Sequence, residues 1–169
     1  RPPAAAAVAP RLMDVRPLVD VVIPVFNDAE RLRQCLQALA RQSLAPDCFA
    51  VWVVDNNSDQ PLQLETQPFR LTLRRCLEPG SYAARNAVLP ELSAPWVAFT
   101  DADCLPATNW LEQGLQAASQ SQGLLAGAIR MLPAQPEQPS LADRLELAFG
   151  MRQDHYVQQG GFGITANLW

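Results

Sequence analysis

Two carboxylates, Asp101 and Asp103, stand one residue apart directly after the apolar run 96–100. In extended chain, side chains at i and i+2 point the same way, so two such carboxylates would repel by roughly 3 kcal/mol at about 5 Å and an effective dielectric constant of about 20. A divalent cation offsets that repulsion and leaves coordination positions for phosphate oxygens. The pair therefore indicates a site for a hard cation and its phosphates. A solvated turn with capping aspartates stays open, because Asp-x-Asp is common.

Two earlier apolar runs also end on polar side chains. Residues 20–27 end on Asn27, and residues 49–55 end on Asp55. Near-continuous β-branched and aromatic residues are typical of parallel strands, whose C-terminal ends share the edge of the sheet where ligands bind. We therefore expect these residues to meet the Asp101/Asp103 pair. Asp55 could accept hydrogen bonds from a base or ribose, or it could simply close a turn.

Pro24 and Asp28 belong to the first of these segments. A proline inside a strand removes a ladder donor, which predicts an interruption where the backbone turns toward a ligand. Asp28 precedes a helical pattern and is interpreted as its N-terminal cap.

Arg85 and Asn86 follow a Pro-Gly break and lie in the first turns of a short helix that Ser81 is expected to cap. A helix N-terminus favours anions, and arginine suits bidentate contact with phosphate or carboxylate. We expect Arg85 to bind a pyrophosphate or to hold Asp101 in place. A surface arginine is the alternative.

The surrounding pattern predicts the elements that position these side chains. Strands are expected at 19–25, 49–54, 70–77, 96–100 and 124–132, and helices at 32–39, 81–86, 109–121 and from 141 to a point before Gly160. This alternation predicts an α/β fold with helices packed on a mostly parallel sheet.

Composition restricts the class of protein. The chain has 169 residues, which is the length of a single domain, expected at 18–169. Residues 1–17 are rich in Pro and Ala and are expected to form a loose arm. The formal net charge of -4 argues against nucleic acid as a partner. The four cysteines show no CxxC pairing, so we expect buried thiols and a reducing, cytoplasmic compartment. No apolar run reaches the length of a membrane span, although peripheral contact with the inner face of a membrane stays open.

Four segments resemble glycosyltransferase family 2, whose members have the GT-A fold. They are Val-Val-Ile-Pro-Val-Phe-Asn at 21–27, Val-Val-Asp-Asn-Asn-Ser-Asp at 53–59, Gly-Ser-Tyr-Ala-Ala-Arg-Asn at 80–86 and Phe-Thr-Asp-Ala-Asp-Cys at 99–104. Each segment alone is weak, but their order and spacing together are specific. The resemblance runs from about Asp20 to the end of the chain.

The resemblance implies a metal-dependent transfer of a sugar from a nucleotide-diphospho-sugar donor to an acceptor hydroxyl, with inversion at the anomeric carbon. The acceptor would be a glycan, a lipid or a small molecule. By match to the family motifs, Asp55 contacts the nucleobase, and Asp101 and Asp103 bind the diphosphate and Mn²⁺ or Mg²⁺. Pro24 and Asn27 match the segment beneath the nucleotide, and Arg85 and Asn86 match a segment beside the acidic motif.

The catalytic base of such a transfer is not assigned. In this family it lies in the acceptor half, after a stretch like 160–169, so we expect it beyond Trp169. Glu146 and Asp154 are carboxylates in the C-terminal third, but their spacing marks neither as a base. The expected domain is therefore incomplete at its acceptor side.

Three other classes of protein share part of this pattern. A non-catalytic nucleotide-sugar-binding module or inactive fragment stays a rival, because no base is identified. A phosphatase of the haloacid dehalogenase type is disfavoured, since its motif has Thr or Val where Leu105 stands and sits on an early strand. A dinucleotide-binding oxidoreductase lacks its GxGxxG after the first strand.

Overall fold

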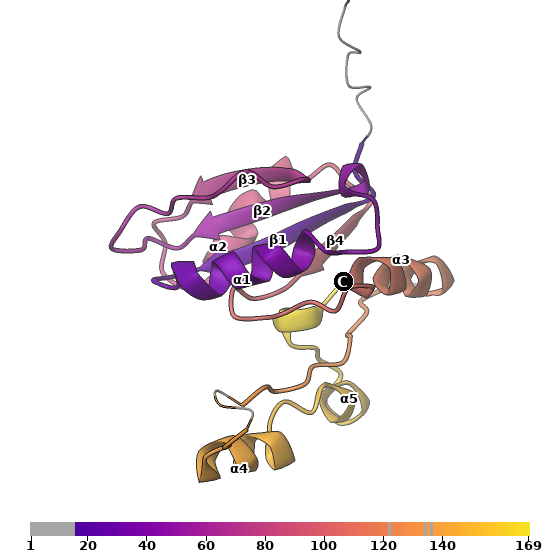
Figure 1. Ribbon diagram of the computed structural model, residues 1–169. Coiled ribbons are helices and arrows are strands. Elements are labelled where there is room, and N and C mark those ends of the chain that lie inside the picture. Colours follow the sequence, from indigo (N-terminus) through magenta and orange to yellow (C-terminus); the bar gives the residue numbers. More distant parts are fainter. Residues whose placement is uncertain (1–15, 122, 134, 136) are drawn as a thin grey trace, which may run out of the picture.

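A four-stranded sheet forms the centre of the molecule in a computed structural model that describes residues 16–121, 123–133, 135 and 137–169 (Figure 1). The strand order is β3-β2-β1-β4, and all three pairings are parallel. The strands are β1 (Val19–Val25), β2 (Phe49–Asp55), β3 (Arg70–Arg75) and β4 (Trp96–Phe99). The predicted α/β fold is confirmed. The predicted arm at 1–17 falls, up to residue 15, outside the described residues.

The described residues form five helices and four shorter turns. The helices are α1 (Ala29–Leu39), α2 (Ser81–Val88), α3 (Trp110–Gln120), α4 (Leu141–Phe149) and α5 (Gln153–His155). Single 3₁₀ turns cover Pro46–Cys48, Leu89–Glu91 and Thr165–Asn167, and a π turn covers Tyr156–Gly160.

Helices on both faces of the sheet explain why β1 and β2 are buried and apolar at nearly every position, whereas the edge strand β3 is largely exposed. In β1, Val21 and Ile23 join the cluster that contains the α1 side chains Leu32 and Leu36, whereas Val22 belongs to the cluster with α2. Figure 1 shows α1 in front of the sheet and α2 behind it. Successive side chains of a strand point to opposite faces, so a strand covered on both sides needs apolar residues at every position.

Pro24 does not interrupt β1, contrary to the prediction. It is buried and pairs with Val54 in the parallel register. The last hydrogen bond on the β4 side runs from the Thr100 N–H to the Val22 carbonyl (3.3 Å), and β4 ends at Phe99. The backbone N–H and C=O groups of alternate residues in a strand point to the same neighbouring strand. The nitrogen of Pro24, like the carbonyl of Val22, therefore points toward the β4 side, where β4 has already ended. The missing donor therefore costs the sheet no hydrogen bond.

One predicted helix boundary is wrong, because Ser81 is the first residue of α2 rather than its cap. The cap is Gly80, whose φ of 113° favours glycine. The helix predicted from Leu141 is confirmed, and it ends at Phe149, before Gly160. The N–H of Gly150 bonds to the Glu146 carbonyl, and a Cβ at Gly150 would lie 2.1 Å from that oxygen.

The predicted strand at 124–132 is reduced to a single bridge. Leu168 pairs in antiparallel fashion with Phe99 of β4 on one side and with Ala126 on the other. Two hydrogen bonds between Leu125 and Trp169 (3.0 and 2.8 Å) extend this contact. A strand needs a partner along its length, and residues 167–169 provide one for only three residues.

No helix in the described part of the chain combines the length and apolar character needed to cross a bilayer. All four cysteines are free thiols, and Cys35 and Cys76 are buried as expected.

Candidate functional site

The parallel register places the ends of the strands along one edge of the sheet. Val25 of β1 lies opposite Asp55 of β2, and Asp55 lies opposite Arg75 of β3. On the other side of β1, Phe99 of β4 lies opposite Val22, so β4 stops earlier and its chain leads directly into the acidic segment. The polar ends of the runs therefore share one edge, as the sequence predicts. We call this edge the C-terminal rim.

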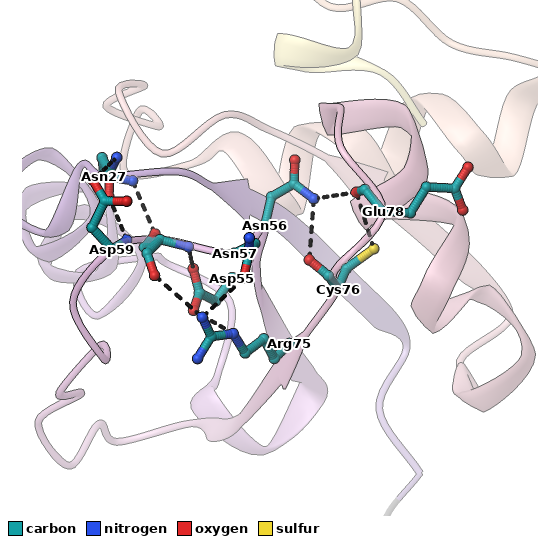
Figure 2. Close-up of polar contacts among 9 residues, drawn as sticks. Asn27, Asp55, Asn56, Asn57, Asp59, Arg75, Cys76 and Glu78 are labelled. Atoms are coloured by element: carbon teal, nitrogen blue, oxygen red, sulfur yellow. Dashed lines mark hydrogen bonds and ion pairs between the residues drawn. The ribbon is translucent and has the colours of Figure 1, made fainter.

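Asn27 ties the end of β1 to the turn after β2 (Figure 2). Its backbone N–H donates to Oγ of Ser58 (2.9 Å), its side-chain amide donates to Oδ2 of Asp59 (2.9 Å), and its Oδ1 accepts from the Asp59 N–H (2.9 Å). Asn27 has a positive φ of 52°, which asparagine tolerates better than most residues. These bonds fix the backbone at the end of β1 against the turn after β2.

Asp55 is buried, and its carboxylate has two different neighbours. Oδ1 accepts a hydrogen bond from the Ser58 N–H (2.9 Å), which closes the turn that the sequence offered as the alternative. Oδ2 lies 3.9 Å from Nε of Arg75. The same guanidinium donates from Nη2 to Oδ1 of Asn57 (3.0 Å) and to the Ser58 carbonyl (3.3 Å). The turn thus contacts Oδ1 of Asp55, and Arg75 contacts Oδ2 (Figure 2).

Asn56 connects this turn to the segment that precedes α2. Its side-chain amide donates to the carbonyls of Cys76 (3.3 Å) and Glu78 (2.6 Å), and its Oδ1 accepts from the Gly80 N–H (2.8 Å). Asn56 is buried, so these bonds satisfy donors and acceptors that water does not reach. The end of β2 thereby determines where α2 begins.

Arg85 on α2 forms an ion pair with Asp101, the first acid of the motif. Nη2 of Arg85 donates to Oδ1 of Asp101, and the Arg85 side chain is 9% exposed. Burial raises the pKa of the Asp101 carboxyl, the positive charge of Arg85 opposes that rise, and Asp103 adds to it. The thiol of buried Cys35 in α1 also donates to the Asp101 carbonyl (3.7 Å). Of the two expectations for Arg85, the contact with Asp101 is present. Asn86, its neighbour, is exposed.

Asp103 does not point where the sequence predicts. The Cys104 N–H bonds to the Asp101 carbonyl (3.0 Å), so residues 101–104 form a turn rather than extended chain. The rule that i and i+2 side chains point the same way does not hold in a turn. The Asp103 side chain is 53% exposed, and Oδ2 lies 3.7 Å from Nη1 of Arg31 in α1. Arg31 itself pairs with Asp28 (2.7 Å), which caps α1 by accepting from the Arg31 N–H (3.3 Å), as predicted.

The acidic motif fits a cation that arrives with a diphosphate. Among the described residues, no group of three or more His, Cys, Asp or Glu side chains could hold a metal ion alone. Mg²⁺ commonly takes only one or two carboxylates and completes its shell with substrate phosphates and water. Asp103 and the second oxygen of Asp101 would supply such carboxylate ligands. Both donors are oxygens, which suits Mg²⁺ or Mn²⁺.

Three residues of the rim were missed by the sequence reasoning: Arg31, Asn56 and Arg75. Arg75 could have been predicted from the sequence, because it is the last residue of β3 just as Asp55 is the last residue of β2. The argument that polar residues at the ends of parallel strands meet at one edge applies to both. Nothing in the local sequence distinguished Arg31 or Asn56 from its neighbours. Arg31 contacts Asp103, 72 positions away, and Asn56 accepts from Gly80, 24 positions away.

Comparisons with known proteins agree with this geometry. Residues 20–165 match the family described as Glycosyl transferase family 2. Glycosyltransferase AglE of Haloferax volcanii is 31% identical over 160 residues, which are 90% of this chain and 52% of AglE. Validoxylamine A glucosyltransferase of Streptomyces hygroscopicus subsp. limoneus is 33% identical over 107 residues, or 60% of this chain and 24% of that protein. The chain thus spans about half of the first relative and a quarter of the second.

Two solved structures have the same fold. Mannosyltransferase PcManGT from Pyrobaculum calidifontis, in complex with GDP-Man and Mn²⁺, is 28% identical with a TM-score of 0.57, over 68% of this chain and 36% of that one. TarS of S. aureus is 21% identical with a TM-score of 0.57, over 69% of this chain and 36% of that one. A parallel sheet of the GT-A type, acids at its C-terminal rim and a family match over most of the chain lead to one conclusion: this chain belongs to glycosyltransferase family 2.

Proposed function

We propose that this chain is the donor-binding part of an inverting glycosyltransferase, which moves a sugar from a nucleotide-diphospho-sugar to an acceptor hydroxyl. The observation that carries the proposal is the shared edge of the sheet. It places Asp55 on one side and the Arg85–Asp101 pair on the other, with Asn56 bonding the two parts together. Inversion at the anomeric carbon is proposed from family membership.

The nucleoside would lie at the end of β2. There the carboxylate of Asp55 accepts a hydrogen bond from the base, while the backbone around Pro24 and Asn27 lies beneath the nucleotide. The bonds from Asn27 to Ser58 and Asp59 support this assignment, because they hold that backbone in place before a ligand binds. A preorganised site loses less conformational entropy on binding.

The diphosphate would lie at the acidic motif, with Mn²⁺ or Mg²⁺ shared between it and Asp103 and Asp101. When bound, the cation neutralises negative charge on the leaving diphosphate. Arg85 positions Asp101 through their ion pair, and the half-exposed carboxylate of Asp103 is open to an ion from solvent. Arg31, which contacts Asp103, adds positive charge near the same oxygens. Asn86 is exposed beside Arg85 and would face the donor.

The acceptor half of the reaction is assigned no residue. A single displacement needs a base to take the acceptor proton. Because the chain spans about half of AglE, we propose donor binding for the chain itself and transfer for the enzyme as a whole. The acceptor class (a glycan, a lipid or a small molecule), the cytoplasmic location and the contact with a membrane stay predictions.

Calorimetric titration of the 169-residue chain with UDP and GDP, with and without Mn²⁺, tests this function. We expect binding that strengthens with Mn²⁺, and we expect Asp103→Asn to weaken the Mn²⁺-dependent binding at least about tenfold, since a ligand to the ion is lost. Asp154→Asn, which changes an exposed acid on α5, is the matched control and should leave binding unchanged. Equal affinity in Asp103→Asn and the unchanged chain, with both folded, would remove the metal-diphosphate assignment.

A further inference from the structure

Each acid of the motif has an arginine of its own, and the two ion pairs differ in burial. Nη2 of Arg85 donates to Oδ1 of Asp101, and the Arg85 side chain is 9% exposed. Nη1 of Arg31 lies 3.7 Å from Oδ2 of Asp103, and these two side chains are 61% and 53% exposed. Opening a buried ion pair leaves a charge without water or a partner, whereas an exposed pair opens at little cost. Of the two arginines, only Arg31 is therefore placed to leave its acid when a ligand arrives.

Arg31 is held at the start of α1 by a second acid. Its Nε lies 2.7 Å from Oδ2 of Asp28, and Asp28 also accepts from the Arg31 N–H (3.3 Å) as the N-cap of the helix. These contacts tether the guanidinium at the base of α1, with Nη1 facing Asp103. Within the part of the chain that the structure describes, no other basic side chain forms an ion pair with Asp103. The charge beside Asp103 therefore comes from Arg31.

This contact places a positive charge at the carboxylate that a cation would use. Oδ1 of Asp101 is engaged by Arg85, so a cation at the motif would depend on the second oxygen of Asp101 and on the carboxylate of Asp103. A guanidinium beside Asp103 partly neutralises that carboxylate and repels a divalent ion that approaches it. Arg31 should therefore weaken the binding of a cation that arrives alone.

A diphosphate at the motif would change this balance. Its negative charges attract both the cation and the guanidinium, so Arg31 no longer opposes the ion. Each of the two ligands then strengthens the binding of the other, and linkage requires the two effects to be equal. We propose that Arg31 is a positioning residue that makes a divalent cation bind together with the diphosphate rather than before it, an inference that rests on the nucleotide-sugar function proposed above.

The alternative role of Arg31 is purely structural. Its pair with Asp28 joins residues i and i+3 in the first turn of α1, and such pairs stabilise helices slightly. In that case, removing the charge would lower the stability of the fold and leave the affinity for a cation unchanged. Cation affinity and thermal stability are therefore measured separately on the same variants.

The test measures Mn²⁺ binding to the 169-residue chain by electron paramagnetic resonance, first without nucleotide and then with saturating UDP, corrected for the Mn²⁺ that UDP binds in solution. Without UDP, Arg31→Gln should bind Mn²⁺ about three- to fivefold more tightly than the unchanged chain, the upper part of the range for an exposed ion pair. With UDP, the two affinities should agree within about 1.5-fold, so that the coupling between UDP and Mn²⁺ falls. Arg31→Lys keeps the charge and should restore the behaviour of the unchanged chain.

Arg33→Gln is the matched control, because Arg33 lies on the same helix but pairs with Glu30 (2.6 Å). It removes the same charge and should leave the affinity for Mn²⁺ unchanged. A second control is needed because the loss of Arg31 also frees the Asp28 carboxylate, which is itself a potential ligand for the ion. Asp28→Asn keeps a capping side chain, and the double variant Asp28→Asn/Arg31→Gln, measured against Asp28→Asn, should show the same gain in Mn²⁺ affinity.

Circular dichroism and thermal unfolding check that each variant is folded, and Arg31→Met is a second uncharged variant that should give the same result as Arg31→Gln. Three results would overturn the inference: no gain in Mn²⁺ affinity in a folded, uncharged Arg31 variant, an equal gain in Arg33→Gln, or loss of the gain in the Asp28→Asn background. Each of these leaves the proposed nucleotide-sugar function in place, since the unchanged chain still binds UDP with Mn²⁺. Failure of the unchanged chain to bind UDP, with or without Mn²⁺, would remove both that function and this inference.

Discussion

The sheet unit, residues 16–121, and the C-terminal third, residues 123–169, bury their apolar side chains to very different extents. The sheet unit provides all buried members of both hydrophobic clusters except Trp169, and β1 is buried at every position. Among the described residues of the C-terminal third, only Gln153, Ala166 and Trp169 are buried. The helix α4 has no buried residue, and its Leu141 and Phe149 are 75% and 79% exposed.

The two regions nevertheless follow the same sequence rule. Both α1 and α4 begin at a polar cap, Asp28 and Ser140, whose side chain accepts a backbone N–H, and both are amphipathic. Only α1 places its apolar stripe against a sheet. An amphipathic pattern thus predicts that a helix forms, but not what its apolar face contacts. Figure 1 shows this difference directly, with α1 against the strands and α4 below them.

The C-terminal third is held to the sheet unit at a few points. Trp169 packs edge-on against Trp110 of α3 with ring centroids 5.5 Å apart, and a Cβ at Gly114 would lie 2.0 Å from the Trp169 ring. Glycine at 114 therefore permits the indole to lie against α3. This contact and the Leu168 bridge fix the last residues beside β4.

The largest expected effect is a difference in stability between two Leu→Ala variants, one in each region. Leu32→Ala in α1 removes a side chain that is 1% exposed and should lower the free energy of unfolding by about 2–5 kcal/mol. Leu145→Ala in α4 removes one that is 53% exposed and should change it by about 0.5 kcal/mol or less. Urea denaturation of both variants measures the difference. Similar losses in the two would mean that α4 contributes as much packing as α1, contrary to the structure.

A smaller effect is expected at the polar anchor of the C-terminal third. Gln153 donates to the carbonyls of Gly127 and Asn167 (both 3.0 Å) and accepts from the Ile164 N–H (2.6 Å). Gln153→Ala leaves the half-buried Gly127 carbonyl and Ile164 N–H without this partner, whereas the Asn167 carbonyl keeps its bond from the Gly127 N–H (3.0 Å). The substitution should cost about 1–3 kcal/mol. Because the bonds join only residues of this region, the loss should be local.

Amide hydrogen exchange can separate a local loss from a global one. The Ile164 amide should exchange faster in Gln153→Ala, while the Asn56 amide, bonded to the Val25 carbonyl (2.8 Å), should keep its rate. Gln158→Ala, an exposed residue of the same region, should leave both rates unchanged. Faster exchange at Asn56 would show that the two regions unfold together.

The sequence predicted the four strands of the sheet because the composition of each run is typical of a strand, and each run also finds a partner strand. The runs that became β1, β2 and β4 are apolar at successive positions, which suits only a strand covered on both faces. The run at 124–132 has a similar composition but finds a partner at Ala126 alone. Whether a strand forms depends on a distant partner, and the local pattern does not contain that information.

For the candidate site, the sequence predicted which strand ends meet but not the direction of every side chain. The shared edge follows from parallel strands, and it brought Asn27, Asp55 and Asp101 to one rim. The direction of Asp103 was not predictable, because one hydrogen bond turns residues 101–104 and sends the two carboxylates to different arginines. Charge at a strand end was a usable signal for Asp55 and, equally, for Arg75.

The smallest expected effect lies on the surface, where the two regions should behave alike. In α1, Arg33 and Gln34 donate to fully exposed Glu30, and these hydrogen bonds lower its pKa to about 2 from an ordinary 4.5. A carboxyl with a lowered pKa stabilises the fold above its unfolded pKa, and that contribution is lost as the pH falls from about 4.5 to about 2. In α5, Arg152 lowers the pKa of Asp154 by the same kind of contact.

NMR titration of both carboxyl groups checks this expectation, with Glu30→Gln as the control for stability. The variant should be slightly less stable than the unchanged chain at pH 6 and equally stable near pH 2, and added salt should shrink the difference. The strength of an exposed ion pair depends on the surrounding solvent and not on the core below it. Both Glu30 in α1 and Asp154 in α5 should therefore titrate below their ordinary pKa values, although only α1 packs on a hydrophobic core. An ordinary titration of Asp154 beside a lowered one of Glu30 would mean that burial of the supporting helix, and not the local arginine, controls these surface charges.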